Sequence, residues 1–185
     1  LTVPEISNPA ARTIRVLVAP SLGGSVLGAL DYLSSYPYGC TEQTLSAFVP
    51  NLVARRTLAT LNIPLTERLK SLDRQVTEGL TRLYDYQHED GGWGWWKTDE
   101  NHPFMTAYAV FGLLEAKTSG YKVDEWRLDN GVRALRKLYL EYPRAVPELK
   151  AYEAYVLALA AAGGITAEEY GDAPRYQQRA ALDEL

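Results

Sequence analysis

The segment Glu67–Gln87, ERLKSLDRQVTEGLTRLYDYQ, decides the fold class of this chain. Its apolar residues recur at steps of three and four positions: Leu69, Leu72, Val76, Leu80 and Leu83. Because an α-helix turns once in 3.6 residues, this spacing puts them on one stripe. The segment therefore predicts a helix that buries one face.

The same spacing recurs along most of the chain after Gly24. The predicted helices are Ser25–Ser35, Gln43–Thr60, Glu67–Gln87, Phe104–Ser119, Val123–Glu141, Glu148–Ala162 and a short one from Thr166. Before them, Thr13–Val18 alternates β-branched residues and predicts a short N-terminal β element. Short loops favour antiparallel α-hairpins, arranged as a bundle, a solenoid or part of an α/α toroid, among which periodicity does not choose.

Gly and Pro residues predict where these helices end or bend. Gly120 and Gly163 follow helical segments, at the position where a left-handed residue ends a helix. Pro50 falls inside the second predicted helix, where a proline removes a hydrogen bond. We therefore expect a kink or a break at Pro50.

Composition limits the function classes that are open. The 185 residues, 46% hydrophobic and 23% charged, are typical of one globular domain. Nineteen basic against 23 acidic residues give a net charge of -4, with no basic stripe, so nucleic acid is not an expected partner. We find no membrane-spanning segment and no signal peptide. The single cysteine excludes an internal disulfide framework and a multi-cysteine zinc site, and no metal or cofactor is expected.

That cysteine, Cys40, stands three residues before Gln43 at the start of a predicted helix. One helical turn brings the two side chains together, and a helix N-terminus favours thiolate over thiol. Gly39 permits backbone geometry that a Cβ would forbid, and Glu42 is placed to assist proton transfer. The sulfur could then attack the Gln43 carboxamide and close an internal thioester. The alternative is that Cys40 is an inert, small buried hydrophobe.

The surrounding residues, Tyr36-Pro-Tyr-Gly-Cys-Thr-Glu-Gln-Thr44, carry more information than the spacing. They resemble the thioester motif of the alpha-2-macroglobulin and complement family, whose usual form is Gly-Cys-Gly-Glu-Gln. The matching positions are Gly39, Cys40, Glu42 and Gln43. Thr41 replaces the second Gly, which is similar to what bacterial alpha-2-macroglobulins show.

Two later features also resemble this family. They are the proline inside the following helix, Pro50, and Phe104-Met-Thr-Ala-Tyr108 near the start of a later helix. The resemblance runs from about Val26 to the C-terminus. It implies that residues 25–185 are a truncated thioester-containing α/α toroid domain, and that residues 1–24 are the end of a flanking β (CUB-like) domain with a linker.

The resemblance also implies a function. The chain would be part of a bacterial, periplasmic or cell-envelope protease inhibitor with further domains. Its thioester would acylate an amine of a trapped target protease, leaving a covalent amide at Gln43 and a free Cys40 thiol. Such a domain reacts once and is no true enzyme. No His follows His102, so amines are the expected acceptors rather than hydroxyls.

A second constellation, Gln87–Trp96, holds three tryptophans separated by glycine. Its composition predicts a tight loop that presents aromatic surface. We expect Tyr36, Tyr38, Trp93 and Trp95 to shield the thioester from water, a role similar to that of the aromatic shield in bacterial family members. The alternative is that these tryptophans plug the end of the helical array.

Two other function classes remain open from sequence. One is an α/α toroid enzyme, either prenyltransferase-like, with zinc on Cys40 and His88 or His102, or glycan-active. A glycan-active site would use acidic residues that crowd the tryptophan loop, namely Glu89, Asp90, Asp99 and Glu100. The other class is an inert structural helical module.

Overall fold

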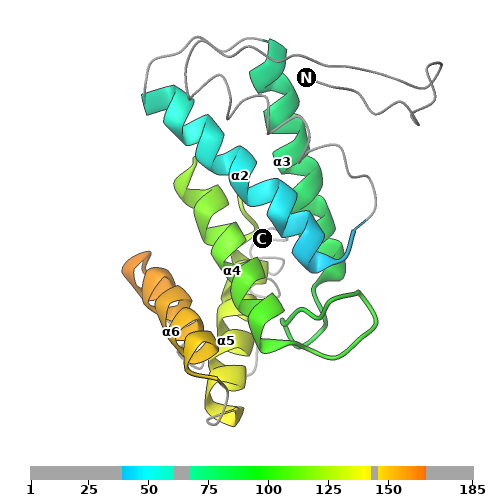
Figure 1. Ribbon diagram of the computed structural model, residues 1–185, viewed down its shortest axis with the longest axis vertical. Helices are drawn as coiled ribbons and strands as arrows, with labels where there is room; N and C mark the ends of the chain where they lie inside the picture. The colour runs from blue at the N-terminus through cyan, green and yellow to red at the C-terminus, as the bar shows by residue number, and fades with distance from the viewer. Residues whose placement is uncertain (1–38, 61–66, 143–145, 166–185) are drawn as a thin grey trace, which may run out of the picture.

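The computed structural model describes residues 39–60, 67–142 and 146–165 (Figure 1). These ranges hold five α-helices and no strand: α2 (Thr41–Thr60), α3 (Glu67–Tyr86), α4 (Pro103–Thr118), α5 (Glu125–Glu141) and α6 (Pro147–Ala162). The expected β element at Thr13–Val18 and the helices expected at Ser25–Ser35 and from Thr166 lie outside the described residues. None of the described helices is long and apolar enough to cross a membrane.

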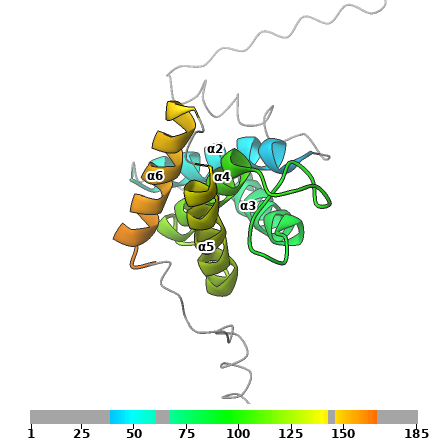
Figure 2. The same cartoon turned by 90° about the horizontal axis from the view of Figure 1, so that it is seen from below.

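The helices are arranged as consecutive hairpins (Figures 1 and 2). Helix α2 contacts α3 and α4, α4 contacts α5 and α6, and α5 contacts α6. Helices α2, α4 and α6 thus form a row in which each helix contacts the next. Helix α3 pairs with α2 and α5 pairs with α4 to form the hairpins. Confirming the sequence analysis, the architecture of the described part is mainly α.

Helix α4 lies at the centre of this arrangement and is apolar on most sides. Its buried residues are Met105, Thr106, Ala107, Ala109, Val110, Gly112, Leu113, Leu114 and Ala116. A helix without a polar face is stable in water only when neighbours surround it, as α2, α5 and α6 do here. The stripe predicted on α3 is confirmed at Leu72, Val76, Leu80 and Leu83, all of which are buried.

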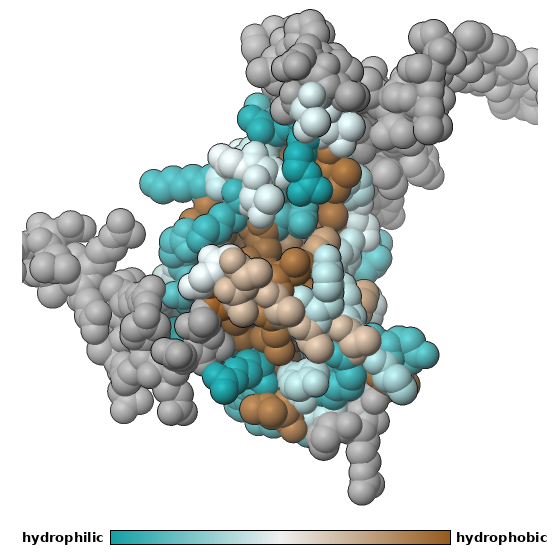
Figure 3. All heavy atoms as spheres, turned by 90° about the vertical axis from the view of Figure 1, so that its left-hand side faces the viewer, coloured by the Kyte–Doolittle hydropathy of each residue, from teal (hydrophilic) through white to brown (hydrophobic). Residues whose placement is uncertain are grey.

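Aromatic rings join α4 to α6. Figure 3 shows that hydrophobic residues gather on this side of the molecule. Phe104 and Phe111 of α4 lie 5.7 and 6.4 Å, ring centre to ring centre, from Tyr152 of α6. Tyr155 lies 6.5 Å from Phe111. Offset ring pairs at such distances add about 0.5–1.5 kcal/mol beyond the area that they bury. These contacts hold α6 against the row.

Hydrogen bonds of one type end both α4 and α6. Gly120 has φ +85° and Gly164 has φ +77°, and each lies one residue past the C-cap. Each donates to a carbonyl of the last turn, and the following residue, Tyr121 or Ile165, donates to the carbonyl one residue further back. This is the Schellman motif. The prediction for Gly120 is confirmed, whereas that for Gly163 is wrong by one position, because Gly163 has φ -80°.

The predicted break at Pro50 is wrong, since α2 runs without interruption from Thr41 to Thr60. A proline inside a helix costs about 3 kcal/mol. Phe48 and Leu52, on either side of it, are 2% and 0% exposed. Burial of each such side chain contributes about 1.5–3 kcal/mol, which offsets the cost.

A charged cluster joins the far end of α2 to α3 and to the end of α4. The Arg55 Nε donates to Asp73 Oδ1 at 2.7 Å, and an Arg55 Nη donates to the Ser119 carbonyl at 3.2 Å. The Tyr121 hydroxyl donates to the same Asp73 oxygen, and the Arg55 guanidinium lies 4.9 Å from the centre of the Tyr121 ring. Asp73 therefore accepts hydrogen bonds both from Arg55 of α2 and from Tyr121, which follows α4.

Candidate functional site

Cys40 occupies the N-cap position of α2, directly before Thr41. Its carbonyl accepts the first helical hydrogen bond, from the Thr44 N–H at 3.0 Å. The Gln43 side chain folds back, and its Oε1 accepts from the Cys40 N–H at 3.2 Å. This is half of a capping box, in which the third helical residue satisfies the N-cap amide. It brings the carboxamide of Gln43 to the residue that carries the only thiol.

The two side chains differ in their access to solvent. Cys40 is buried, with 7% of its surface exposed, whereas Gln43 is exposed. Thr41 and Thr44 are also buried, and neither hydroxyl has a hydrogen-bond partner among the described residues. Glu42, half-buried, accepts a hydrogen bond from the Ser46 hydroxyl at 3.1 Å.

Gly39 is needed at its position because Gln43 occupies the space beside it. A Cβ added to Gly39 would lie 2.7 Å from the Gln43 Cβ and 3.0 Å from its Oε1. Real Cβ atoms do not approach a carbon to 2.7 Å, so any other residue would displace the folded-back carboxamide. The Tyr86 hydroxyl donates to the Gly39 carbonyl at 3.4 Å, which ties this residue to the end of α3.

The loop between α3 and α4 holds the first turn of α2 through its main chain. The Thr41 N–H donates to the Trp95 carbonyl at 2.9 Å, and the His102 N–H donates to the Trp93 carbonyl at 2.8 Å. The same loop therefore binds the first residue of α2 and the residue before α4. The expected proximity of the tryptophan loop to the first turn of α2 follows from these two bonds.

The three tryptophans of the loop have different environments. Trp93 is fully buried, its indole N–H donates to the Leu83 carbonyl at 2.8 Å, and its ring packs closely over Gly131. Trp95 and Trp96 are 41% and 55% exposed. The expectation of an aromatic surface thus fits the last two, while Trp93 fills the core, as in the plug alternative. Tyr36 and Tyr38 lie outside the described residues.

Residues of the Phe104–Tyr108 motif hold Trp93 in place. The Trp93 N–H donates to the Thr106 hydroxyl at 3.0 Å, and that hydroxyl donates to the Trp93 carbonyl at 3.1 Å. Met105 and Thr106 are both fully buried. The motif therefore holds the loop in place through these hydrogen bonds, a role that its sequence pattern does not predict.

Polar side chains give the loop its shape. Asp99 accepts from the Trp95 and Trp96 N–H groups at 2.9 and 3.1 Å. Asp90 accepts from the Asn101 side chain, and the same Asn101 pairs with His88 Nδ1 at 2.7 Å. The side chains of His88, Asp90 and Asp99 thus stabilise the conformation of the loop.

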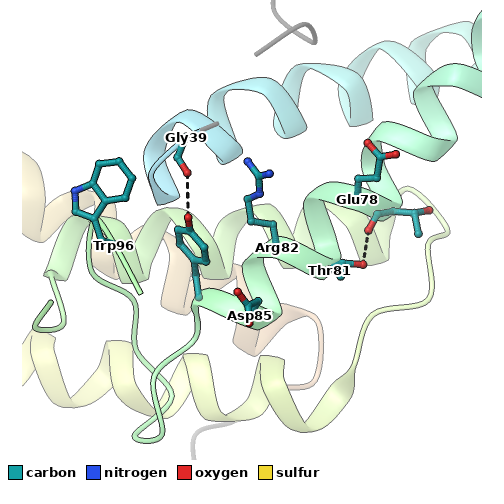
Figure 4. Close-up of a pocket in the computed structure, with 8 residues that line it drawn as sticks. Gly39, Glu78, Thr81, Arg82, Asp85 and Trp96 are labelled. Atoms are coloured by element: carbon teal, nitrogen blue, oxygen red, sulfur yellow. Dashed lines mark hydrogen bonds between the residues drawn. The ribbon is translucent and has the colours of Figure 1, made fainter. Parts of the chain in front are cut away.

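A cleft adjoins the reactive end of α2 (Figure 4). It encloses about 730 Å³ between α3 and the tryptophan loop. Its lining residues are Gly39, Thr77, Glu78, Thr81, Arg82, Asp85, Tyr86 and Trp96. Trp96, which lines this cleft beside Gly39, belongs to the tryptophan loop but was not among the expected shielding residues. The cleft gives a path from solvent to the residue before Cys40.

The residues that an enzyme alternative would use are not gathered into a metal site. Within the described ranges, no three His, Cys, Asp or Glu side chains lie close enough to hold a metal ion. The His102 ring contacts the Trp95 ring in a tilted arrangement, with ring centres 5.7 Å apart, and its Nδ1 is buried without a partner in the described part.

Comparisons with known proteins identify related chains. A family model described as the A-macroglobulin TED domain matches residues 17–138. The alpha-2-macroglobulin of Thermotoga maritima is 39% identical over 145 residues, which cover 78% of this chain and 8% of that protein. The chain thus spans less than a tenth of that relative.

Solved structures share the fold. Native Escherichia coli alpha-2-macroglobulin, from domain MG7 to the C-terminus, aligns with a TM-score of 0.57 and 28% identity over 72% of this chain and 23% of that one. Salmonella alpha-2-macroglobulin reacted with methylamine aligns with a TM-score of 0.58 and 29% identity, over 76% of this chain and 10% of that one. The described helices therefore form part of an α/α toroid, which confirms the predicted fold class.

Proposed function

The chain belongs to the family of A-macroglobulin TED domains, and from this premise we propose that Cys40 and Gln43 form an internal thioester. The observation that carries the proposal is the 3.2 Å hydrogen bond from the Cys40 N–H to the Gln43 Oε1. It holds the carboxamide at the cysteine, so that closure of the bond needs side-chain rotation and no movement of α2. Residues 25–185 are the thioester domain, and residues 1–24 end a flanking β domain.

Closure of the thioester balances without a co-reactant. The Cys40 Sγ attacks the Gln43 Cδ, the C–N bond of the carboxamide breaks, and ammonia leaves with the thiol proton. An amide is a poor electrophile, but a fixed intramolecular arrangement can lower a barrier by about 7–11 kcal/mol. Glu42 assists this proton transfer, from a position at the first turn of α2.

Opening of the thioester transfers the acyl group. An amine nitrogen attacks the Gln43 Cδ, the C–S bond breaks, and an amide replaces it while the sulfur leaves as thiolate. Because Cys40 is the N-cap of a 20-residue helix, the positive end of the helix dipole stabilises that thiolate. The amide is stable, so the domain reacts once and does not turn over.

Shielding keeps the bond from hydrolysis before the amine arrives. Tyr36, Tyr38 and Trp95 form the cover over the motif, and Trp93 supports it from the core. The main-chain bond from Thr41 to Trp95 supports this role, because it holds the main chain of this exposed residue beside the first turn of α2. Exclusion of water by such aromatic surface slows hydrolysis.

In the whole protein, the acceptor is an amine of a target protease. The chain is one domain of a larger bacterial protease inhibitor in the periplasm or cell envelope, and its other partners are further domains of that protein. The match to the Thermotoga maritima relative, which covers 8% of that protein, supports such an organisation. The covalent amide at Gln43 is the trap.

Intact mass tests the proposal. The fresh chain should weigh one ammonia less than its sequence encodes, and methylamine should add to Gln43 while it frees one thiol for maleimide labelling. Cys40→Ala, the matched control, should keep the encoded mass and take up no methylamine. A wild-type chain of full encoded mass, inert to methylamine, would favour the structural module or a toroid enzyme, and zinc analysis would separate those two.

A further inference from the structure

One lysine of this chain, Lys97, lies two residues after Trp95, whose carbonyl is bonded to the first residue of α2. Lys97 directly follows Trp96, which lines the same cleft as Gly39. The main chain here is held to the first turn of α2 by the bond between the Thr41 N–H and the Trp95 carbonyl. Asp99 fixes the next two peptide groups by accepting from the Trp95 and Trp96 N–H groups. The main chain that carries Lys97 is therefore fixed two residues after its bond to the first turn of α2.

The end of that side chain is held by α3. The Lys97 Nζ donates to Asp85 Oδ1 at 2.5 Å, and Asp85 is a lining residue of the cleft. Lys97 itself lines a neighbouring pocket together with residues of α5. Figure 4 shows Asp85 on α3 below Gly39, with Trp96 on the other side. An ammonium that donates to a carboxylate has no lone pair with which to attack a carbonyl carbon.

This ion pair is a weak restraint. The two side chains are 57% and 58% exposed. Exposed ion pairs change the population of the bound state by only about 1.5- to 5-fold, because water competes for both charges. Lys97 therefore spends part of its time released, as a flexible amine attached to a loop that is bound at the thioester.

We propose that Lys97 is an internal acceptor for the Gln43 acyl group and that Asp85 restrains it. The inference rests on the proposed thioester. The neutral Lys97 amine attacks the Gln43 Cδ, the C–S bond breaks, and an isopeptide bond forms between Nζ and Cδ. The Cys40 sulfur leaves as thiolate and takes up the proton that the amine loses. The product is a domain that has inactivated itself by an internal crosslink.

Three measurements identify this product. The crosslinked chain has the same mass as the thioester chain, since both lack one ammonia, but its thiol is free and methylamine no longer adds. Hydrolysis, the competing loss, instead adds one water to the mass. Proteolytic digestion then yields a branched peptide that joins the Gln43 segment to the Lys97 segment.

The experiment follows the full chain during storage at neutral pH without amines. The wild-type chain should lose methylamine reactivity partly through the branched peptide. Asp85→Asn should accelerate formation of this peptide by about 2- to 5-fold, because the amine is released. Lys97→Arg should abolish it and prolong methylamine reactivity, since arginine keeps a cation for Asp85 but is not nucleophilic at this pH. Glu125→Gln, which removes the exposed pair with Lys117, is the matched control and should change neither rate.

The outcomes separate the inference from the function on which it rests. A fresh wild-type chain of full encoded mass overturns both. A fresh chain with a thioester that decays only by hydrolysis, in wild type and in Asp85→Asn alike, overturns the role of Lys97 and leaves the thioester standing. A branched peptide that persists in Lys97→Arg likewise assigns the acceptor to another lysine and refutes the proposal.

Discussion

Substitution of Gly39 by alanine tests whether the folded-back position of Gln43 forms the thioester. The new methyl group would lie 2.7 Å from the Gln43 Cβ, an atom fixed to the backbone of α2 that cannot rotate away. It would also lie 3.0 Å from Oε1, the atom that accepts from the Cys40 N–H. Overpacking of this kind costs about 1–3 kcal/mol. We therefore expect thioester formation to slow by about 5- to 150-fold.

The assay is the rate at which freshly refolded chain loses one ammonia, followed by intact mass, with methylamine uptake as the second readout. Gly120→Ala is the control. It introduces strain at φ +85°, but its Cβ has no atom within 4 Å and is remote from Gln43 in sequence. It should lower the free energy of unfolding by about 1–2 kcal/mol and leave thioester formation unchanged. If Gly39→Ala forms the thioester at the wild-type rate, the geometric argument for Gln43 is refuted.

Three further predictions concern the framework of the site. Asp73→Ala should lower the free energy of unfolding in urea by about 1–3 kcal/mol, because Arg55 and Tyr121 both lose their acceptor; an unchanged midpoint would contradict this. Burial, and then the hydrogen bond to Asp73, raise the pKa of Tyr121. Above the ordinary tyrosine pKa of about 10 the unfolded chain loses this proton first, so stability should fall as pH rises, and less steeply in Tyr121→Phe. Trp93→Ala should lower the free energy of unfolding by about 3–5 kcal/mol, because it leaves a cavity and an empty space beside Leu83. Thermal unfolding measures this loss.

Much of the fold could be predicted because it depends on local spacing. The stripe from Leu72 to Leu83 is a property of one segment, and the structure buries it as expected. Pro50 could not be judged locally, since its cost is offset by the burial of Phe48 and Leu52. The end of α6 at Ala162 was predicted correctly, but the left-handed residue after it was not, because two adjacent glycines offer the same freedom and hydrogen bonding selects Gly164.

The candidate site also has features that local sequence predicts and features that it does not. The spacing from Cys40 to Gln43 predicts that one helical turn brings their side chains together. The capping bond joins the Cys40 main-chain N–H to the Gln43 side chain, so contact between the sulfur and the carboxamide stays a prediction. The local sequence does not show which of the tryptophans is buried and which are exposed. Trp93 enters the core because Gly131, far along the chain, leaves room for its ring. The contact between Thr41 and Trp95 joins main-chain atoms and therefore has no signature in residue type.

That last contact bears on how the site can change over evolutionary time. The anchoring atoms at Thr41, Trp93, Trp95 and His102 are amide nitrogens and carbonyl oxygens, which every lineage retains whatever mutations it accumulates, unless proline replaces a donor. The side chains at 95, 96 and 97 can thus be exchanged while the helix starts in the same register. Natural variation at these three positions would then change the lifetime of the proposed thioester and its preference among acceptor groups, while the main-chain framework of the site stays the same.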